Sequence, residues 1–247
     1  MTDQEPGSDL SRRVARGAFS TLGATLVSRA LGMVQSIVVA RLLDPYRVGL
    51  FAIVSYVLSV AGTLCDLGLP VAVTKLIAED RAIRPRVVLR VAGRLARVIL
   101  SVSLGVAAAL FLGSSGLSRL YDEPSLSLLF QLGAVALVLS VAGAVRSAVF
   151  QGFQRIHLLA GLSVLGTAAM LAFTLLLTPW LGLPGIIVAA ILTEAVVWLG
   201  SARPVRRMIA DVRGKPRGEV NVPPAIGLLP RAFHVAAPSF LNALTLF

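Results

Sequence analysis

Six long apolar runs, separated by short polar connections, constrain the fold of this chain more than any other feature of its sequence. Each run holds roughly the 20 residues that an α-helix needs to cross the hydrocarbon core of a bilayer. Hydrophobic residues make up 56% of the chain and charged residues only 14%, a balance that soluble globular domains do not have. The sequence therefore predicts an all-α polytopic membrane protein.

We expect six spans, at residues 18–40, 49–73, 98–117, 126–149, 158–181 and 185–202. They form a six-helix transmembrane bundle (18–202), preceded by a cytoplasmic tail (1–17) and followed by a basic cytoplasmic linker (203–231). The last apolar run (232–247) is shorter than a span and predicts the start of a seventh transmembrane helix, which is incomplete. No signal-peptide cleavage site follows the basic N-terminal residues, so we expect the first span to be retained.

Basic residues are distributed unevenly between the two sides that this topology creates. Nineteen of the 23 lysines and arginines lie on the side of the N-terminus, whereas Arg41, Arg47 and Arg119 lie on the other. Short cytoplasmic connections of membrane proteins carry an excess of lysine and arginine. The distribution predicts a multi-pass protein of the cytoplasmic membrane with its N-terminus inside. Topology and attraction to anionic lipid also account for the net charge of +11 without a nucleic-acid partner.

The most basic of these connections includes residues 75–97, where apolar residues are spaced among arginines. Such a pattern is typical of an amphipathic helix on the inner membrane surface. A solvated anchor that only fixes the topology is the simpler interpretation, and it is the one we favour.

Neither the cysteine nor the acidic residues of the connections form a pattern typical of catalysis. Cys65 is the single cysteine and lies in an apolar run without a nearby histidine, so we expect it to pack in the core. The acidic pairs at 79–80 and 122–123 each lie beside basic or turn residues, and we interpret them as solvated. The sequence predicts no metal, no cofactor and no enzymatic activity.

Three charged residues inside the apolar runs are the candidate site residues. Arg29 lies about eleven residues, or ~16 Å, from either end of its span, and a central arginine costs at least ~2.5 kcal/mol unless it faces a cavity or partner. Glu194 lies at a similar depth, so we expect it to pair with Arg29. Asp66 lies nearer the inner end of its span. There its carboxylate could be hydrated from the inner face, or could accept hydrogen bonds from a backbone that Gly68 and Pro70 loosen. Structural and substrate-binding roles stay open for all three.

Small residues indicate how neighbouring spans approach each other. Glycine, alanine and serine recur in the first and fifth spans, which allows close helix packing. Gly182, Pro184 and Gly185 predict a tight outer turn, which makes the fifth and sixth spans a hairpin.

One block of the sequence resembles the N-terminal signature of the bacterial polysaccharide transporter family: residues 39–80, VARLLDPYRVGLFAIVSYVLSVAGTLCDLGLPVAVTKLIAED. In that family the first span ends in ARLL, and an acidic turn with proline or glycine leads to a second span that closes with DLGL and a basic residue. The sequence QGFQ at 151–154 and an AxP motif in the seventh run are also similar. The resemblance covers essentially the whole chain and depends on the order and spacing of loose motifs.

The resemblance implies a member of the multidrug, oligosaccharidyl-lipid and polysaccharide exporters, in which two six-helix bundles enclose a cavity with alternating access. This chain would be the N-terminal lobe of a twelve-to-fourteen-helix flippase that moves lipid-linked oligosaccharide on a polyprenyl diphosphate to the outer leaflet. Arg29 occupies a place where related flippases also carry an arginine, and a guanidinium matches phosphate oxygens in bidentate geometry. Implied partners are the lipid-linked oligosaccharide, anionic lipid, and glycosyltransferases or a polymerase of a polysaccharide cluster.

The chain has about half the spans of such flippases, so we expect a truncated member, with assembly from two chains as the alternative. A multidrug-type cation antiporter and a non-transporting scaffold subunit of a polysaccharide assembly complex are the alternative functions. Arg29 argues against cationic substrates. A membrane-bound glycosyltransferase or phosphotransferase would need a cluster of carboxylates for a divalent cation, and the sequence offers no convincing one.

Overall fold

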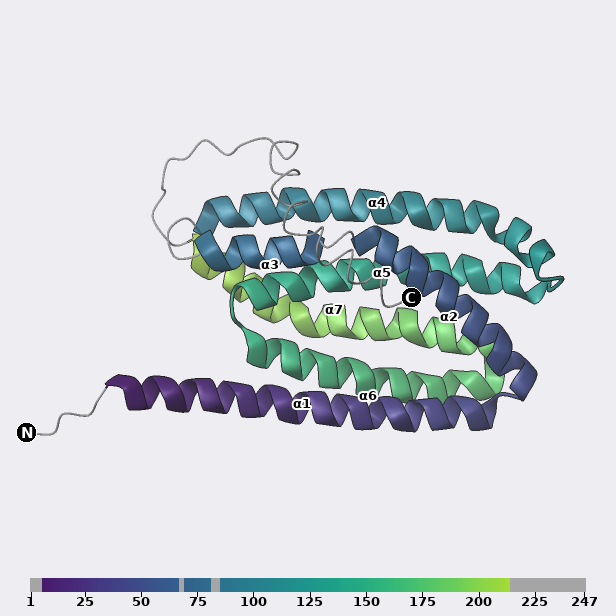
Figure 1. The fold of residues 1–247 in the computed structure, drawn as a ribbon, viewed down its shortest axis with the longest axis horizontal. Helices are drawn as coiled ribbons and strands as arrows, with labels where there is room; N and C mark the ends of the chain where they lie inside the picture. Colours follow the sequence, from purple (N-terminus) through teal and green to yellow (C-terminus); the bar gives the residue numbers. More distant parts are fainter. Residues whose placement is uncertain (1–5, 67–68, 81–84, 214–247) are drawn as a thin grey trace, which may run out of the picture.

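The computed structural model describes residues 6–66, 69–80 and 85–213, and this part of the chain is helical apart from short connections (Figure 1). Its helices are α1 (Pro6–Leu42), α2 (Pro45–Asp66), α3 (Leu69–Asp80), α4 (Pro85–Leu120), α5 (Ser125–Gly152), α6 (Ile156–Leu181) and α7 (Leu183–Arg213). All of them except α3 are long and apolar enough to cross a membrane. The predicted all-α polytopic membrane fold is confirmed. Helices suit this setting because each one satisfies its own backbone hydrogen bonds in lipid.

The first, third, fourth, fifth and sixth spans agree in place with the prediction, although the helices extend further. The stretches that meet the length and hydropathy of a span are Leu22–Leu42, Pro45–Asp66, Val91–Leu120, Ser125–Gly152, Ile156–Leu181 and Leu183–Val205. Residues 6–17, expected as a tail, already belong to α1, and the first part of the expected linker belongs to α7. The predicted seventh helix and residues 214–231 of the linker lie outside the described residues.

The second span is shorter than predicted, because α2 ends at Asp66 and a separate helix, α3, begins at Leu69. In a continuous helix over 49–73, Pro70 would leave an unpaired carbonyl in the interior. At the first turn of α3 its missing N–H costs nothing, because that position has no intrahelical acceptor.

The predicted amphipathic helix within 75–97 is likewise divided. The short α3 ends at Asp80, and α4 runs from Pro85 without interruption into the third span. The arginines of residues 85–97 therefore belong to an extension of a membrane-spanning helix, not to a separate helix of their own.

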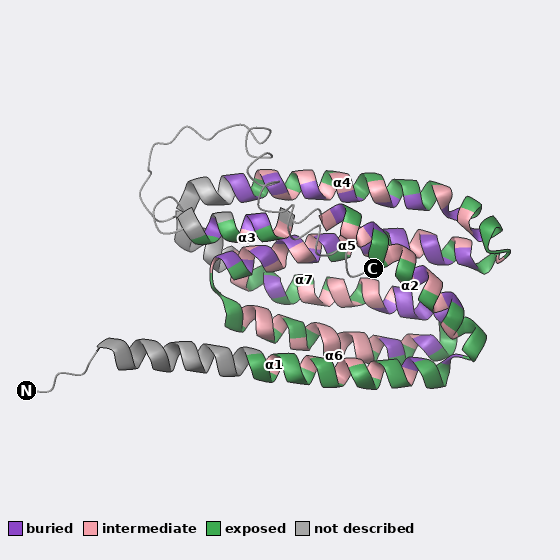
Figure 2. Ribbon diagram, in the orientation of Figure 1, coloured by how far each residue is buried: buried purple, intermediate pink, exposed green. Residues whose placement is uncertain are grey.

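The long helices run nearly side by side, and α5 lies in the middle of them (Figure 1). It packs against α2, α3, α4 and α7, whereas α6 packs on α7, and α1 packs mainly on α6. The central helix is also the most buried one: 44% of the span in α5 is buried, but only 6% of the spans in α1 and α6 (Figure 2).

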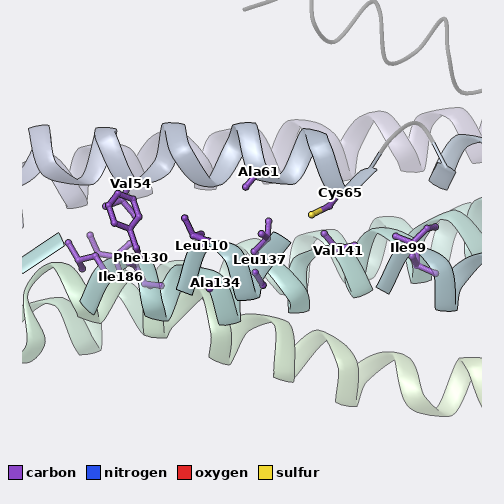
Figure 3. Packing of buried hydrophobic residues seen from close by; sticks show 14 of the residues in the cluster. Val54, Ala61, Cys65, Ile99, Leu110, Phe130, Ala134, Leu137, Val141 and Ile186 are labelled. Atoms are coloured by element: carbon purple, nitrogen blue, oxygen red, sulfur yellow. The ribbon is translucent and has the colours of Figure 1, made fainter. Parts of the chain in front are cut away.

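The hydrophobic core lies between α2, α3, α4, α5 and the first turns of α7. Figure 3 shows Phe130 and Leu137 of α5 close to Val54 and Ala61 of α2. Cys65 is fully buried in the same core, and the structure confirms its packing role.

Two short connections at one end of the bundle have clear local causes. Asp44 caps α2 by accepting a hydrogen bond at 2.9 Å from the backbone N–H of Arg47, with Pro45 in the first turn. Between α6 and α7, Gly182 has φ +64° and donates its N–H to the carbonyl of Thr178 at 2.8 Å. The predicted hairpin of the fifth and sixth spans is confirmed.

At its C-terminal end, α5 approaches α3 closely, because Gly152 has no side chain. A Cβ at Gly152 would lie 2.6 Å from the Cβ of Ile77 and 3.1 Å from the carbonyl oxygen of Thr74. Thr74 in turn donates its hydroxyl to the carbonyl of Ala148 at 3.2 Å. The glycine of the QGFQ motif therefore makes room for α3.

We expect Gly152→Ala to lower the thermal unfolding temperature of the detergent-purified chain, because overpacking of this kind costs about 1–3 kcal/mol. The gain in helix propensity, roughly 1 kcal/mol at most, does not offset it. Circular dichroism at 222 nm provides the measurement. Gly161→Ala in α6 is the matched control, because no described atom lies within 4 Å of that Cβ. Equal effects of the two substitutions would contradict the proposed contact.

Candidate functional site

Arg29 does not form the predicted ion pair. Its side chain is exposed on α1, with exposed Leu26 and Met33 beside it at helical spacing. No hydrogen bond or ion pair joins it to another described residue. The expected partner, Glu194, binds a different arginine, Arg146 of α5. Depth along the spans could not reveal which side of α1 carries Arg29, and the pairing prediction was wrong for this reason.

The charged pair of the bundle joins α5 and α7. Nη2 of Arg146 lies 3.4 Å from Oε2 of Glu194, and the two side chains are only 10% and 27% exposed. Arg146 is one of the nineteen basic residues that the predicted topology places on the side of the N-terminus. The structure places it inside α5, six residues before the helix ends at Gly152. A signal was available, because Arg146 also lies within the predicted span 126–149.

Two neighbours shape the surroundings of this pair. Gly143 lies one turn before Arg146, and a Cβ there would lie 2.9 Å from Oε2 of Glu194. The missing side chain therefore leaves the space that the carboxylate occupies. On another side, the ring of Trp198 lies 5.2 Å from the guanidinium carbon of Arg146, within reach of a cation–π interaction.

The guanidinium of Arg146 keeps unused hydrogen-bonding capacity. Its Nη1 is buried, and no described residue accepts a hydrogen bond from it. A guanidinium offers five N–H donors, and an unpaired buried donor costs about 1–3 kcal/mol, more for a charged group. An acceptor that approaches Nη1 would therefore bind with a favourable free energy.

The pair borders a cavity of about 570 Å³ between α1, α5, α6 and α7. A ligand pocket commonly has about this size. Polar side chains line it together with the charged pair: Gln35, Ser140, Ser147, Gln151, Ser163, Thr167 and Thr193. The hydroxyls of Ser140 and Thr167 donate to carbonyls of their own helices, so their oxygens present lone pairs to any further partner.

A second cavity, of about 410 Å³, adjoins the first. It extends toward α2, where Leu58, Ser59 and Gly62 line it. Glu194 lines both cavities, as do Ser140, Met170 and Thr193. The carboxylate therefore stands between two cavities, a more polar one on the side of α6 and a mostly apolar one on the side of α2.

The three predicted site residues are not brought together. Asp66 is half-buried at the end of α2, and neither cavity includes it or Arg29 among its lining residues. Of the three, only Glu194 lines the cavities. Within the described ranges, no three histidine, cysteine, aspartate or glutamate side chains lie close enough to hold a metal ion.

These features define a class of protein: a helical polytopic membrane protein with a charged pair held inside its bundle beside two adjoining cavities. The chain matches the family model described as "Polysaccharide biosynthesis protein" over residues 14–243, and it belongs to that family. The family expected from residues 39–80 is thereby confirmed.

Among individual proteins, the chain is similar to stage V sporulation protein B of Bacillus subtilis (strain 168). The two are 39% identical over 67 residues, which is 27% of this chain and 13% of that relative. The matched part thus spans only a small share of the relative's length. No solved structure matches this chain.

Breaking the charged pair on one side should destabilise the bundle more than removing both charges. We expect Arg146→Met or Glu194→Met to lower the unfolding free energy by roughly 1–3 kcal/mol, below the ~3–5 of a fully buried pair because Glu194 is partly exposed. The double variant should recover part of the loss, since it leaves no uncompensated charge. Thermal unfolding of all three variants measures this.

The exposed pair of Arg47 and Asp44 is the matched control. Its atoms are 3.2 Å apart, but both side chains are 55% exposed, so Arg47→Met should cost less than about 1 kcal/mol. A double variant as unstable as the sum of the two single ones would show that Arg146 and Glu194 do not interact energetically.

Proposed function

We propose that this six-span bundle belongs to a flippase-type transporter that moves a lipid-linked oligosaccharide or polysaccharide precursor across the cytoplasmic membrane. The observation that carries the proposal is the buried guanidinium of Arg146, whose Nη1 faces no acceptor in the part of the chain that the structure describes, although it borders a polar cavity. Charged side chains inside membrane spans are costly and mark substrate pathways or ion relays. Membership in the polysaccharide biosynthesis family supports the same class of function.

A polyprenyl diphosphate is the substrate group that fits this guanidinium. Its phosphate oxygens accept paired N–H groups in the planar geometry that arginine offers. Gln35, Ser147 and Gln151 supply further polar atoms around the cavity. In this proposal the bundle binds and transfers the intact lipid-linked sugar and carries out no covalent chemistry.

Arg29, Asp66 and Glu194 remain proposed substrate-binding residues with different places in the path. Arg29 lies on the exposed face of α1, where it would meet an anionic headgroup from outside this bundle. Asp66 lies at the end of α2 nearer α3, at the expected cytoplasmic side. Glu194 would regulate access to Arg146. The proposed partners are anionic lipid and the glycosyltransferases or polymerase that supply and consume the saccharide.

We propose a cytoplasmic N-terminus, and the arrangement of helix ends supports it. The start of α1 and the α5–α6 connection lie at one end of the bundle, and the α1–α2, α4–α5 and α6–α7 connections lie at the other (Figure 1). Arg41, Arg47 and Arg119 are near the second end. Arg155 lies in the α5–α6 connection at the first end, and the helix segments that lead to that end carry these basic residues: Lys75 of α3, Arg94 and Arg97 in the first half of α4, and Arg203 in the second half of α7. The first end would face the cytoplasm.

Replacing Arg146 by glutamine at the chromosomal locus should block export. We expect lipid-linked saccharide to accumulate in the inner leaflet and surface polysaccharide to fall by about tenfold or more, because a charge-assisted hydrogen bond contributes roughly 1.5–3 kcal/mol. Surface polysaccharide and extracted lipid-linked precursor are measured together. Arg47→Gln is the control, and its export should stay near the wild-type level.

The same variants separate the alternative functions. A multidrug-type cation antiporter would tolerate Arg146→Gln, with saccharide export and resistance to cationic compounds unchanged, whereas Glu194→Gln would lower that resistance. If the chain is a scaffold subunit, these substitutions should change neither saccharide export nor resistance to cationic compounds. An immunoblot of membrane fractions shows that the chain stays in the membrane. Normal export with membrane-inserted Arg146→Gln would overturn the proposed flippase function.

Labelling of single cysteines tests the orientation. Because Cys65 is the only natural cysteine, Cys65→Ser gives a background in which Arg119→Cys and Arg155→Cys can each be labelled alone. We expect a membrane-impermeant maleimide to label Arg119→Cys in intact cells and Arg155→Cys only after the cells are opened. The reverse pattern would place the N-terminus outside.

A further inference from the structure

The contact between Arg146 and Glu194 leaves room for a competing anion. At 3.4 Å the N–O distance is longer than the 2.7–2.9 Å typical of charge-assisted hydrogen bonds. Nη1 of the same guanidinium has no acceptor among the described residues. The carboxylate thus uses only part of the donor capacity of Arg146.

The carboxylate of Glu194 can also turn into a second cavity. Glu194 lines both cavities, and Ser59, Ser140 and Thr193 line the mostly apolar one on the side of α2. Ser140 donates its hydroxyl to the carbonyl of Leu137 and Thr193 to the sulfur of Met170, so their oxygens can accept a hydrogen bond from a protonated Glu194. A glutamate side chain has three rotatable bonds, so it can leave the guanidinium without movement of the backbone. The side chain of Glu194 can therefore turn from the cavity beside Arg146 into the cavity on the side of α2.

We propose that the cavity between α1, α5, α6 and α7 is an oxyanion site that works by exchange, in which a phosphate-type group displaces Glu194 from Arg146. The incoming oxygens accept hydrogen bonds from Nη1 and Nη2, and Glu194 turns toward the cavity on the side of α2. The exchange deepens the proposed function and relies on it for the identity of the natural ligand.

Proton uptake by Glu194 accompanies the exchange. Among the described residues, Arg146 of α5 is the charged neighbour of this carboxylate, and the lining residues from α1, α2, α6 and α7 bring no other charged side chain. A protonated Glu194 carries no negative charge and no longer competes with the oxyanion for the guanidinium of Arg146. Binding of the anion is therefore stronger at lower pH.

Trp198 makes the exchange observable. Its ring lies 5.2 Å from the guanidinium of Arg146, and the sequence contains only one other tryptophan, the exposed Trp180. A Trp180→Phe background leaves Trp198 as the single tryptophan. Its emission should change when an anion takes the place of the carboxylate.

The test titrates the Trp180→Phe chain in phosphatidylcholine nanodiscs with sodium sulfate, which keeps its charge over the pH range used, and with inorganic diphosphate. We expect saturable binding, about tenfold tighter in Glu194→Gln and independent of pH in that variant, since a neutral side chain no longer competes. Arg146→Gln should abolish binding. If Arg146→Gln does not fold, Arg146→Lys should weaken binding, because it keeps the charge but loses the bidentate geometry.

Two arms identify the source of the oxyanion. Nanodiscs that contain phosphatidic acid present a phosphate on a lipid, and prior occupancy there, seen as a weakened sulfate response, would assign the site to a headgroup. Binding of sulfate or diphosphate that phosphatidic acid leaves unchanged would assign it to a soluble anion. Both results support the exchange and differ only in the ligand.

The outcomes also separate this inference from the proposed function. Sulfate binding that Glu194→Gln weakens or leaves unchanged would overturn the exchange, even if Arg146→Gln blocks export in cells. Conversely, an intact exchange in nanodiscs with normal export by Arg146→Gln cells would retain the oxyanion site and overturn the flippase function.

Discussion

The arrangement of this bundle depends on close approach to α5 at three glycines. A Cβ at Gly133 would lie 2.9 Å from Leu58 of α2, one at Gly143 equally close to Glu194 of α7, and one at Gly152 even closer to Ile77 of α3. Lipid tails are as apolar as the side chains, so association within a membrane depends on tight packing and polar contacts more than on the hydrophobic effect. One helix thus provides a separate site of close approach for each of three neighbours.

The middle glycine connects packing with chemistry. Gly143 leaves space for a carboxylate where Gly133 leaves space for leucine, so the same device that brings helices together also holds a charged pair inside the bundle. A buried pair contributes little net stability when its desolvation is counted. Its presence in a membrane-spanning segment agrees better with the proposed role in binding than with a role in folding.

Hydropathy predicted the spans well because the bilayer fixes their length and polarity. It did not predict the end of α2 at Asp66, although Pro70 signalled a local interruption. The partner of Glu194 could not be predicted in the same way. The depth of Arg29 and Glu194 follows from counting residues, whereas the direction of each side chain depends on how its helix is rotated against its neighbours. Arg29 and Arg146 differ in that direction, and no local pattern in the sequence records it.

The way α1 is attached has a mechanical consequence. This helix packs mainly on α6, and Ala24, Ser28 and Gly32, half-buried and four residues apart, lie along one side of it. A slide of four residues, ~6 Å at ~1.5 Å per residue, would bring Ala24 to the place of Ser28 and Ser28 to the place of Gly32. Because each step replaces one small residue by another, the surface is nearly periodic, and α1 has neighbouring registers of similar shape along α6.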